Sequence, residues 1–95
     1  MGKVEIKKMA TAGSVESNDI LIMVSKGEGE VQIELESLVI QQYGENIKKV
    51  ILETLKELNV EDVKLIAKDK GALDFTIRSR VKTAIKRGSG DIDEL

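Results

Sequence analysis

Residues 19–36 read DILIMVSKGEGEVQIELE, and this stretch decides the fold class of the chain. Residues 20–24 are apolar on both faces of a strand, which is typical of a central strand that is covered on both sides. In residues 31–36 apolar side chains alternate with polar ones, as in a strand with one buried face. Between them, residues 26–29 form a turn signal with two glycines, which adopt positive φ readily. The stretch therefore predicts a β-hairpin over residues 19–36.

A helix is predicted immediately after this hairpin. Apolar side chains recur there at steps of three and four residues, namely Val39, Tyr43, Ile47, Val50, Ile51, Leu55 and Leu58. Ser37 is a plausible N-cap. Gly44 interrupts the pattern, so the helix is expected to restart near Glu45. Asn59 is suited to the left-handed position that ends a helix, with Val60 folding back on the last turn.

Further elements follow toward the C-terminus. Residues 63–67 alternate as in a fourth strand, and residues 69–72 read as a loop. A second helix is indicated by Leu73, Ile77, Val81, Ala84 and Ile85, and Gly88 is expected to stop it. The β-branched residues within 75–77 leave a strand there as an open alternative.

The predicted element order is β-β-β-α-β-α, with the first short strand in residues 4–7. We expect an α+β domain in which two helices pack on one face of a small mixed sheet. The strand–helix–strand unit of residues 31–68 should cross over right-handedly if its strands run parallel. Residues 1–88 are expected to form this single domain, and residues 89–95 a flexible acidic tail.

The amino-acid composition limits the kinds of function that the chain can have. The chain has 95 residues with 41% hydrophobic and 34% charged side chains, as expected for one globular domain. It contains no run of 18 apolar residues and no signal-peptide pattern, so we expect a cytoplasmic protein without a membrane span. With no Cys and no His, it lacks the commonest metal ligands, thiol nucleophile and general base. We therefore expect no catalytic residues, no metal site and no independent enzyme.

Residues 11–19 form a polar connection between two apolar segments, and Ser14 lies at its centre. Ala12 and Gly13 carry almost no side chain, so a bulky group could approach the Ser14 hydroxyl without a clash. On these grounds the stretch is either a modification loop or an ordinary loop whose Ser and Asn bond to nearby backbone. Ser17 is a competing hydroxyl that local chemistry does not exclude.

A resemblance to a known family favours the modification loop. Residues 12–19, Ala-Gly-Ser-Val-Glu-Ser-Asn-Asp, are similar to the modification loop of the citrate lyase acyl carrier proteins, the gamma subunits of that enzyme. Residues 69–74, Asp-Lys-Gly-Ala-Leu-Asp, resemble the second signature of this family. Shorter matches are Leu35–Ser37, Gln42–Gly44 and Val50–Leu55. The similarity extends from about Val4 to Arg87. The Asp-Ser-Leu motif of ordinary acyl carrier proteins is absent from the sequence, and their four-helix bundle is not expected.

The resemblance implies that Ser14 carries 2'-(5''-phosphoribosyl)-3'-dephospho-coenzyme A through a phosphodiester, a group that recombinant protein can lack. It also implies a non-catalytic carrier in bacterial citrate fermentation. Acetyl and citryl thioesters would pass between the alpha (citrate CoA-transferase) and beta (citryl lyase) subunits, with cleavage to oxaloacetate and acetate. A dedicated transferase would load the group. Alternatives are a malonate decarboxylase-type carrier, or a small α+β ligand- or RNA-binding module without a covalent cofactor.

Three charged features remain open. Glu16 and Asp19 either keep the loop solvated or present it to a basic partner surface. Residues 64–87, the basic segment, contain eight basic and two acidic side chains. These cations form either a solvated helix face or a contact for phosphates or for an acidic partner; nucleic acid is disfavoured by the acidic pI and the scarce aromatic residues.

In residues 69–74, a turn at Gly71 and a helix cap at Asp74 are expected, with a structural or partner-facing role.

Overall fold

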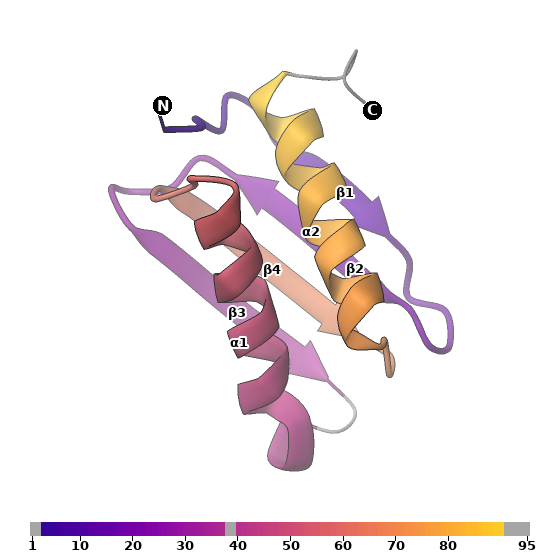
Figure 1. The fold of residues 1–95 in the computed structure, drawn as a ribbon. Helices are drawn as coiled ribbons and strands as arrows, with labels where there is room; N and C mark the ends of the chain where they lie inside the picture. Colours follow the sequence, from indigo (N-terminus) through magenta and orange to yellow (C-terminus); the bar gives the residue numbers. More distant parts are fainter. Residues whose placement is uncertain (1–2, 38–39, 91–95) are drawn as a thin grey trace.

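The computed structural model describes residues 3–37 and 40–90, with residues 40–42 described only as helical backbone. Its elements follow the predicted order. They are β1 (Ala10–Gly13), β2 (Ile20–Ser25), β3 (Val31–Ser37), α1 (Ile40–Glu57), β4 (Val63–Asp69) and α2 (Asp74–Ser89). The strands form one mixed sheet in the order β1-β2-β4-β3, and both helices lie on one face of it (Figure 1). The predicted α+β fold class is therefore confirmed.

The predicted hairpin over residues 19–36 is wrong, because β4 lies between β2 and β3. It pairs antiparallel with β2 and parallel with β3, so that Leu65 lies opposite both Val24 and Ile33. Residues 31–68 do form a strand–helix–strand unit with parallel strands. Local alternation correctly locates β2 and β3, but it does not show that a later strand is inserted between them.

The connection of residues 26–30 bridges two strand spacings and is not a tight turn. Two spacings amount to about 10 Å, well within the reach of five extended residues. The connection is held to the start of β4 by two hydrogen bonds. Gly29 N–H donates to Asp62 Oδ1 (3.0 Å), and Val63 N–H donates to Glu30 O (3.1 Å).

The strand predicted in residues 4–7 is also wrong. This segment packs irregularly against the end of α2, where the N–H groups of Lys7 and Lys8 donate to the carbonyl of Gly88 at 2.8 and 3.1 Å. Ile6 is buried there in the core. The alternating pattern therefore reflects one buried side chain, and the strand that pairs with β2 is β1.

The start of α1 differs from the prediction at Gly44. Gly44 does not interrupt the helix, because the packing of its buried face outweighs a propensity cost of about 1 kcal/mol. Ser37 is the last residue of β3, and its hydroxyl donates to Asp69 Oδ2 (3.0 Å), while its predicted N-cap role stays a prediction. Residues 38–39, which include the predicted helical position Val39, lie outside the described residues.

The predicted end of α1 is confirmed. Asn59 adopts a left-handed conformation with φ of 61°. Val60 N–H donates to Leu55 O (3.0 Å), and Val60 is buried. The chain therefore folds back on the last helical turn, as in a Schellman motif.

In α2, residues 75–77 are helical, which decides against a strand there. Gly88 does not stop this helix, which runs through Ser89 to a left-handed C-cap at Gly90. Glycine at position 88 allows close packing, because a Cβ there would lie 3.0 Å from Val24 Cγ2 and 3.3 Å from Lys8 O, so these neighbours would have to shift. Of the predicted tail, residues 89–95, Ser89 is helical and buried and Gly90 is the C-cap, whereas residues 91–95 lie outside the described residues, so the acidic tail beyond Gly90 stays a prediction.

The core lies between the helices and the covered face of the sheet. Its largest members are Ile20, Ile22, Val24, Ile51, Leu55, Leu65, Ile77 and Val81. On the opposite face Leu21 and Met23 are only half-buried, so the prediction that residues 20–24 are covered on both sides is wrong. Within the part of the chain that the structure describes, no helix is long and apolar enough to cross a membrane.

Candidate functional site

Ser14 begins the Ser14 loop, residues 14–19, which closes a hairpin between β1 and β2. Gly13 precedes it with φ of 88°, and a Cβ at this position would overlap the carbonyl oxygen of Ile20. The backbone geometry therefore excludes a side chain at position 13, and the lack of one also leaves the Ser14 hydroxyl accessible to a bulky group. The close fit fixes where Ser14 leaves the strand.

The two serines of the loop differ in their surroundings. Ser14 is half-buried; its hydroxyl donates to Asp19 Oδ2 (2.8 Å) and accepts from Glu16 N–H (3.3 Å). Ser17 is exposed, and its hydroxyl has no hydrogen bond to any described residue. The structure thus orients the Ser14 oxygen and leaves the Ser17 oxygen free to rotate.

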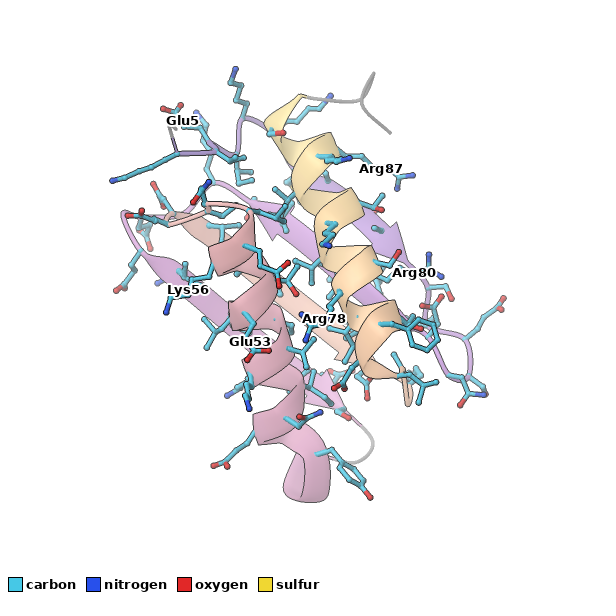
Figure 2. The ribbon with its side chains drawn as sticks, in the orientation of Figure 1. Glu5, Glu53, Lys56, Arg78, Arg80 and Arg87 are labelled. Carbon is cyan, nitrogen blue, oxygen red and sulfur yellow. The ribbon has the colours of Figure 1, made fainter. Side chains whose placement is uncertain are left out.

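Asp19 is held by a distant cation, which sequence reasoning missed. Arg80 Nε donates to Asp19 Oδ1 (3.0 Å) and Arg80 Nη2 to Oδ2 (3.2 Å), a two-point pair. Figure 2 shows Arg80 on the side of α2 that faces away from α1, toward β1. Asp19 is therefore more than a solvated flank of the loop, and no local spacing signal connects residues 61 positions apart.

These contacts lower the pKa of Asp19 from 3.8 to about 2. The hydrogen bonds from Arg80 contribute most, burial opposes them, and bonds from Ser14 and from Ile20 N–H (2.7 Å) add to the lowering. Only 16% of the Asp19 side chain is exposed. The group is a fixed carboxylate that accepts hydrogen bonds, and so low a pKa makes it a weak base.

The second family signature lies directly beside the Ser14 loop. Asn18 N–H donates to Lys70 O (2.8 Å), and Lys70 N–H donates to Asp19 O (2.9 Å). Buried Asp69 holds the turn, because its carboxylate accepts from the N–H groups of Gly71 (3.1 Å) and Ala72 (3.0 Å). Residues 69–72 therefore form a support for the loop, a role that spacing alone did not reveal.

Asp74 is not the cap of α2 but its first residue. Leu73 occupies the N-cap position without a side-chain hydrogen bond. Asp74 Oδ1 accepts from Asn46 Nδ2 of α1 (3.1 Å). The carboxylate therefore joins the two helices and lies in the first turn, where negative charge is favourable.

Large apolar side chains are exposed on three segments at this end of the fold. They are Val15 in the Ser14 loop, Tyr43 in the first turns of α1, and Leu73 and Phe75 at the start of α2. Tyr43 and Leu73 also line a shallow cavity of about 410 Å³ that extends inward to Ile47. Such patches are typical of surfaces that meet other molecules.

Several cations of the basic segment make contacts within the chain. Besides Arg80, Arg78 pairs with Glu57 of α1 (3.3 Å), and Arg87 Nη1 donates to the carbonyl of Thr11 (2.9 Å). The face that was expected to be solvated thus also connects α2 to α1 and to β1 through these arginines (Figure 2). Among the described residues, no group of three or more His, Cys, Asp or Glu is placed to hold a metal ion.

Comparison with known proteins places the chain in two steps. A family model described as the malonate decarboxylase delta subunit matches residues 7–88. The fold is that of a chain in the crystal structure of a Pseudomonas malonate decarboxylase hetero-tetramer in complex with malonate. The two share a TM-score of 0.77 and 16% sequence identity over 90% of this chain and 89% of the other. The protein is therefore an acyl carrier domain of this α+β type, not a helical bundle.

Sequence relatives identify the particular family. The chain is 53% identical over 83 residues to a citrate lyase acyl carrier protein of Lactiplantibacillus plantarum, covering 87% of this chain and 86% of the relative. It is 42% identical over 91 residues to one of Halothermothrix orenii, covering 96% and 97%. The chain belongs to the citrate lyase acyl carrier protein family.

Proposed function

We propose that this protein is the acyl carrier subunit of a citrate lyase and that Ser14 carries 2'-(5''-phosphoribosyl)-3'-dephospho-coenzyme A through a phosphodiester. One observation supports this assignment above others: of the two loop hydroxyls, only that of Ser14 is held in a fixed position, by Asp19. Exposed neighbours at 15–18 leave room for a large group. The residues fit a phosphate-linked arm, because a hydroxyl is available for the ester and Arg80 supplies a nearby cation.

When bound, the group supplies the thiol that a chain without cysteine lacks. The chain itself contributes a fixed attachment point in the loop between β1 and β2. The weakly basic carboxylate of Asp19 orients the Ser14 hydroxyl and is poorly suited to accept its proton. The proton acceptor in loading therefore comes from the loading transferase, and the carrier is not a catalyst.

In this function the carrier alternates between an alpha subunit, which exchanges acetyl for citryl on the thioester, and a beta subunit, which cleaves citryl to oxaloacetate. Tethering raises the local concentration of the thioester at both sites. The exposed apolar residues around the Ser14 loop are suited to contact these subunits and the loading transferase. We assign the assembly to the bacterial cytoplasm.

A malonate decarboxylase carrier is the second candidate, since the matching family model and the similar solved structure bear that name. The identities of 42–53% to citrate lyase carriers favour the first candidate. A ligand- or RNA-binding module would leave Ser14 unmodified, so intact mass separates it from both carriers.

The test is loading in a strain that contains the dedicated transferase. Wild-type protein should gain the mass of one arm, Ser14→Ala should gain none, and Ser17→Ala should load as wild type does. The effect is all-or-none because Ser14→Ala removes the oxygen that forms the ester. Circular dichroism checks that each variant is folded. Loading of Ser14→Ala, or failure of Ser17→Ala alone, would contradict the assignment.

A further inference from the structure

Arg80 uses only part of its hydrogen-bonding capacity on Asp19. A guanidinium has five N–H donors arranged along two edges. The edge with Nε and Nη2 holds the Asp19 carboxylate, and Nη1 has no hydrogen bond to any residue that the structure describes. The Arg80 side chain is 40% exposed, so a ligand has access to it. Asp19 therefore fixes the position of a cation that has further donors to offer.

That cation lies close to the Ser14 hydroxyl. Asp19 Oδ2 accepts from both Ser14 Oγ (2.8 Å) and Arg80 Nη2 (3.2 Å), so the two donors are no more than about 6 Å apart. A phosphoryl group on Ser14 Oγ extends two bonds further and brings its oxygens within reach of the guanidinium. Nη2 belongs to both edges of the guanidinium, so the edge that holds Nη1 includes the nitrogen that shares Asp19 Oδ2 with the Ser14 hydroxyl.

We propose that Arg80, positioned by Asp19, forms a binding site for a phosphate ester on Ser14. The inference rests on the proposed function, because that function supplies the phosphoryl group. An ester oxygen carries no hydrogen, so the bond from Ser14 to Asp19 is lost on modification. The new anion then lies beside a carboxylate, and the Arg80 cation compensates the repulsion by bridging the two.

This site has a consequence for the arm. Arg80 ties the phosphate to α2, while the rest of the group remains free to swing. The pivot of the arm is then set by a two-point contact on a rigid helix and not by the mobility of an exposed loop. The other arginine of the same turn serves as a matched control, because Arg78 pairs with Glu53 and Glu57 on α1.

The test uses the full chain with phosphoserine at position 14, which requires no loading enzyme. Phosphorus NMR follows the second pKa of the phosphate, about 6 in an isolated site. Arg80→Gln should raise this pKa by about one unit, since an adjacent cation favours the dianion. Arg80→Lys should raise it less, because the charge remains but the fork is lost. Arg78→Gln should leave it unchanged.

A second measurement avoids substitution at Arg80. Phosphorylation should shift the side-chain ¹⁵N and ¹H signals of Arg80 and leave those of Arg78 in place. Equal phosphate pKa values for the wild-type and Arg80→Gln chains, or unmoved Arg80 signals, would overturn the proposal. Either result would leave the loading test at Ser14 unaffected. Conversely, absence of natural loading with a normal phosphate site would count against the proposed function alone.

Discussion

Two loops leave opposite ends of β2, and their sequences are alike while their structures are not. The Ser14 loop and the connection of residues 26–30 are both polar. A glycine at positive φ occurs at each: Gly13, which directly precedes the Ser14 loop, at 88°, and Gly29 within the connection at 97°. The backbone of Gly13 presses against a neighbouring strand, whereas nothing lies within 4 Å of a Cβ built on Gly29. The chain is therefore packed at Gly13 and open at Gly29, although Gly27 of the same connection lies close to the backbone of Val63.

The difference arises from what reaches each loop from elsewhere in the chain. Asp19 receives the guanidinium of Arg80 and is mostly shielded from solvent. Asp62, the acid beside the other connection, is exposed and accepts from the backbone N–H of Gly29. A loop that a distant cation fixes can hold a hydroxyl in one orientation. The connection of residues 26–30 is held by the exposed Asp62 carboxylate and by one backbone bond from Val63, and no distant cation fixes it, so it cannot do so as well.

The largest predicted effect concerns the two glycines. Gly13→Ala should lower the free energy of unfolding by about 3 kcal/mol, because it adds left-handed strain to an overlap with a backbone carbonyl that cannot move aside. Gly29→Ala should cost about 1 kcal/mol, since only the strain applies there. Urea denaturation followed by circular dichroism measures both values. Equal costs would show that the two glycines are packed alike, contrary to the comparison.

The next effect is the stabilisation by the Asp19–Arg80 pair. The pKa of Asp19 falls from 3.8 to about 2 on folding, which corresponds to roughly 2 kcal/mol. Because Arg80 is 40% exposed, solvent screening reduces this, and Asp19→Asn should cost about 1 kcal/mol at pH 6. The folded-state pKa is depressed, so the stabilisation is present above about pH 4 and is lost as the pH falls toward 2.

The measurement is the unfolding free energy of wild type and Asp19→Asn between pH 2 and pH 6. The difference between them should shrink steadily below pH 4. Asp62→Asn is the matched control at the connection of residues 26–30 and should change stability by less than about 0.5 kcal/mol throughout. A difference for Asp19→Asn that stays constant down to pH 2 would mean that the charge of Asp19 contributes nothing.

Sequence periodicity predicted most elements because their burial is local in origin. The stripe through Ile47, Ile51 and Leu55 and the alternation at Ile33 and Leu65 correspond to side chains that face one core. Pairing partners were not predictable in this way. Strand β4 follows β3 by a whole helix and yet separates it from β2, and no local pattern records that insertion.

The site shows the same division. Ser14 was singled out from its loop by small neighbours and by family resemblance, and its role stays a prediction; the structure adds that its hydroxyl donates to Asp19. The contribution of Arg80 was hidden among eight basic residues, because its partner lies far away in the sequence. The prediction that Gly88 stops the helix was wrong for a related reason, since the residues that pack closely against this glycine belong to other segments of the chain.

The smallest predicted effect is that of removing the Ser14 hydroxyl. It separates the contacts that hold Asp19 in the loop from the one contact that orients this hydroxyl. Ser14→Ala should cost only about 0.5 kcal/mol of unfolding free energy, because Asp19 keeps its bonds from Arg80 and from Ile20 N–H. It should raise the pKa of Asp19, but less than Arg80→Gln does, in line with the order of their contributions. Carboxyl ¹³C NMR titration of Asp19 measures this shift, with Ser17→Ala as the silent control. If Ser14→Ala raised the pKa as much as Arg80→Gln, the serine and not the arginine would be the main support of this carboxylate.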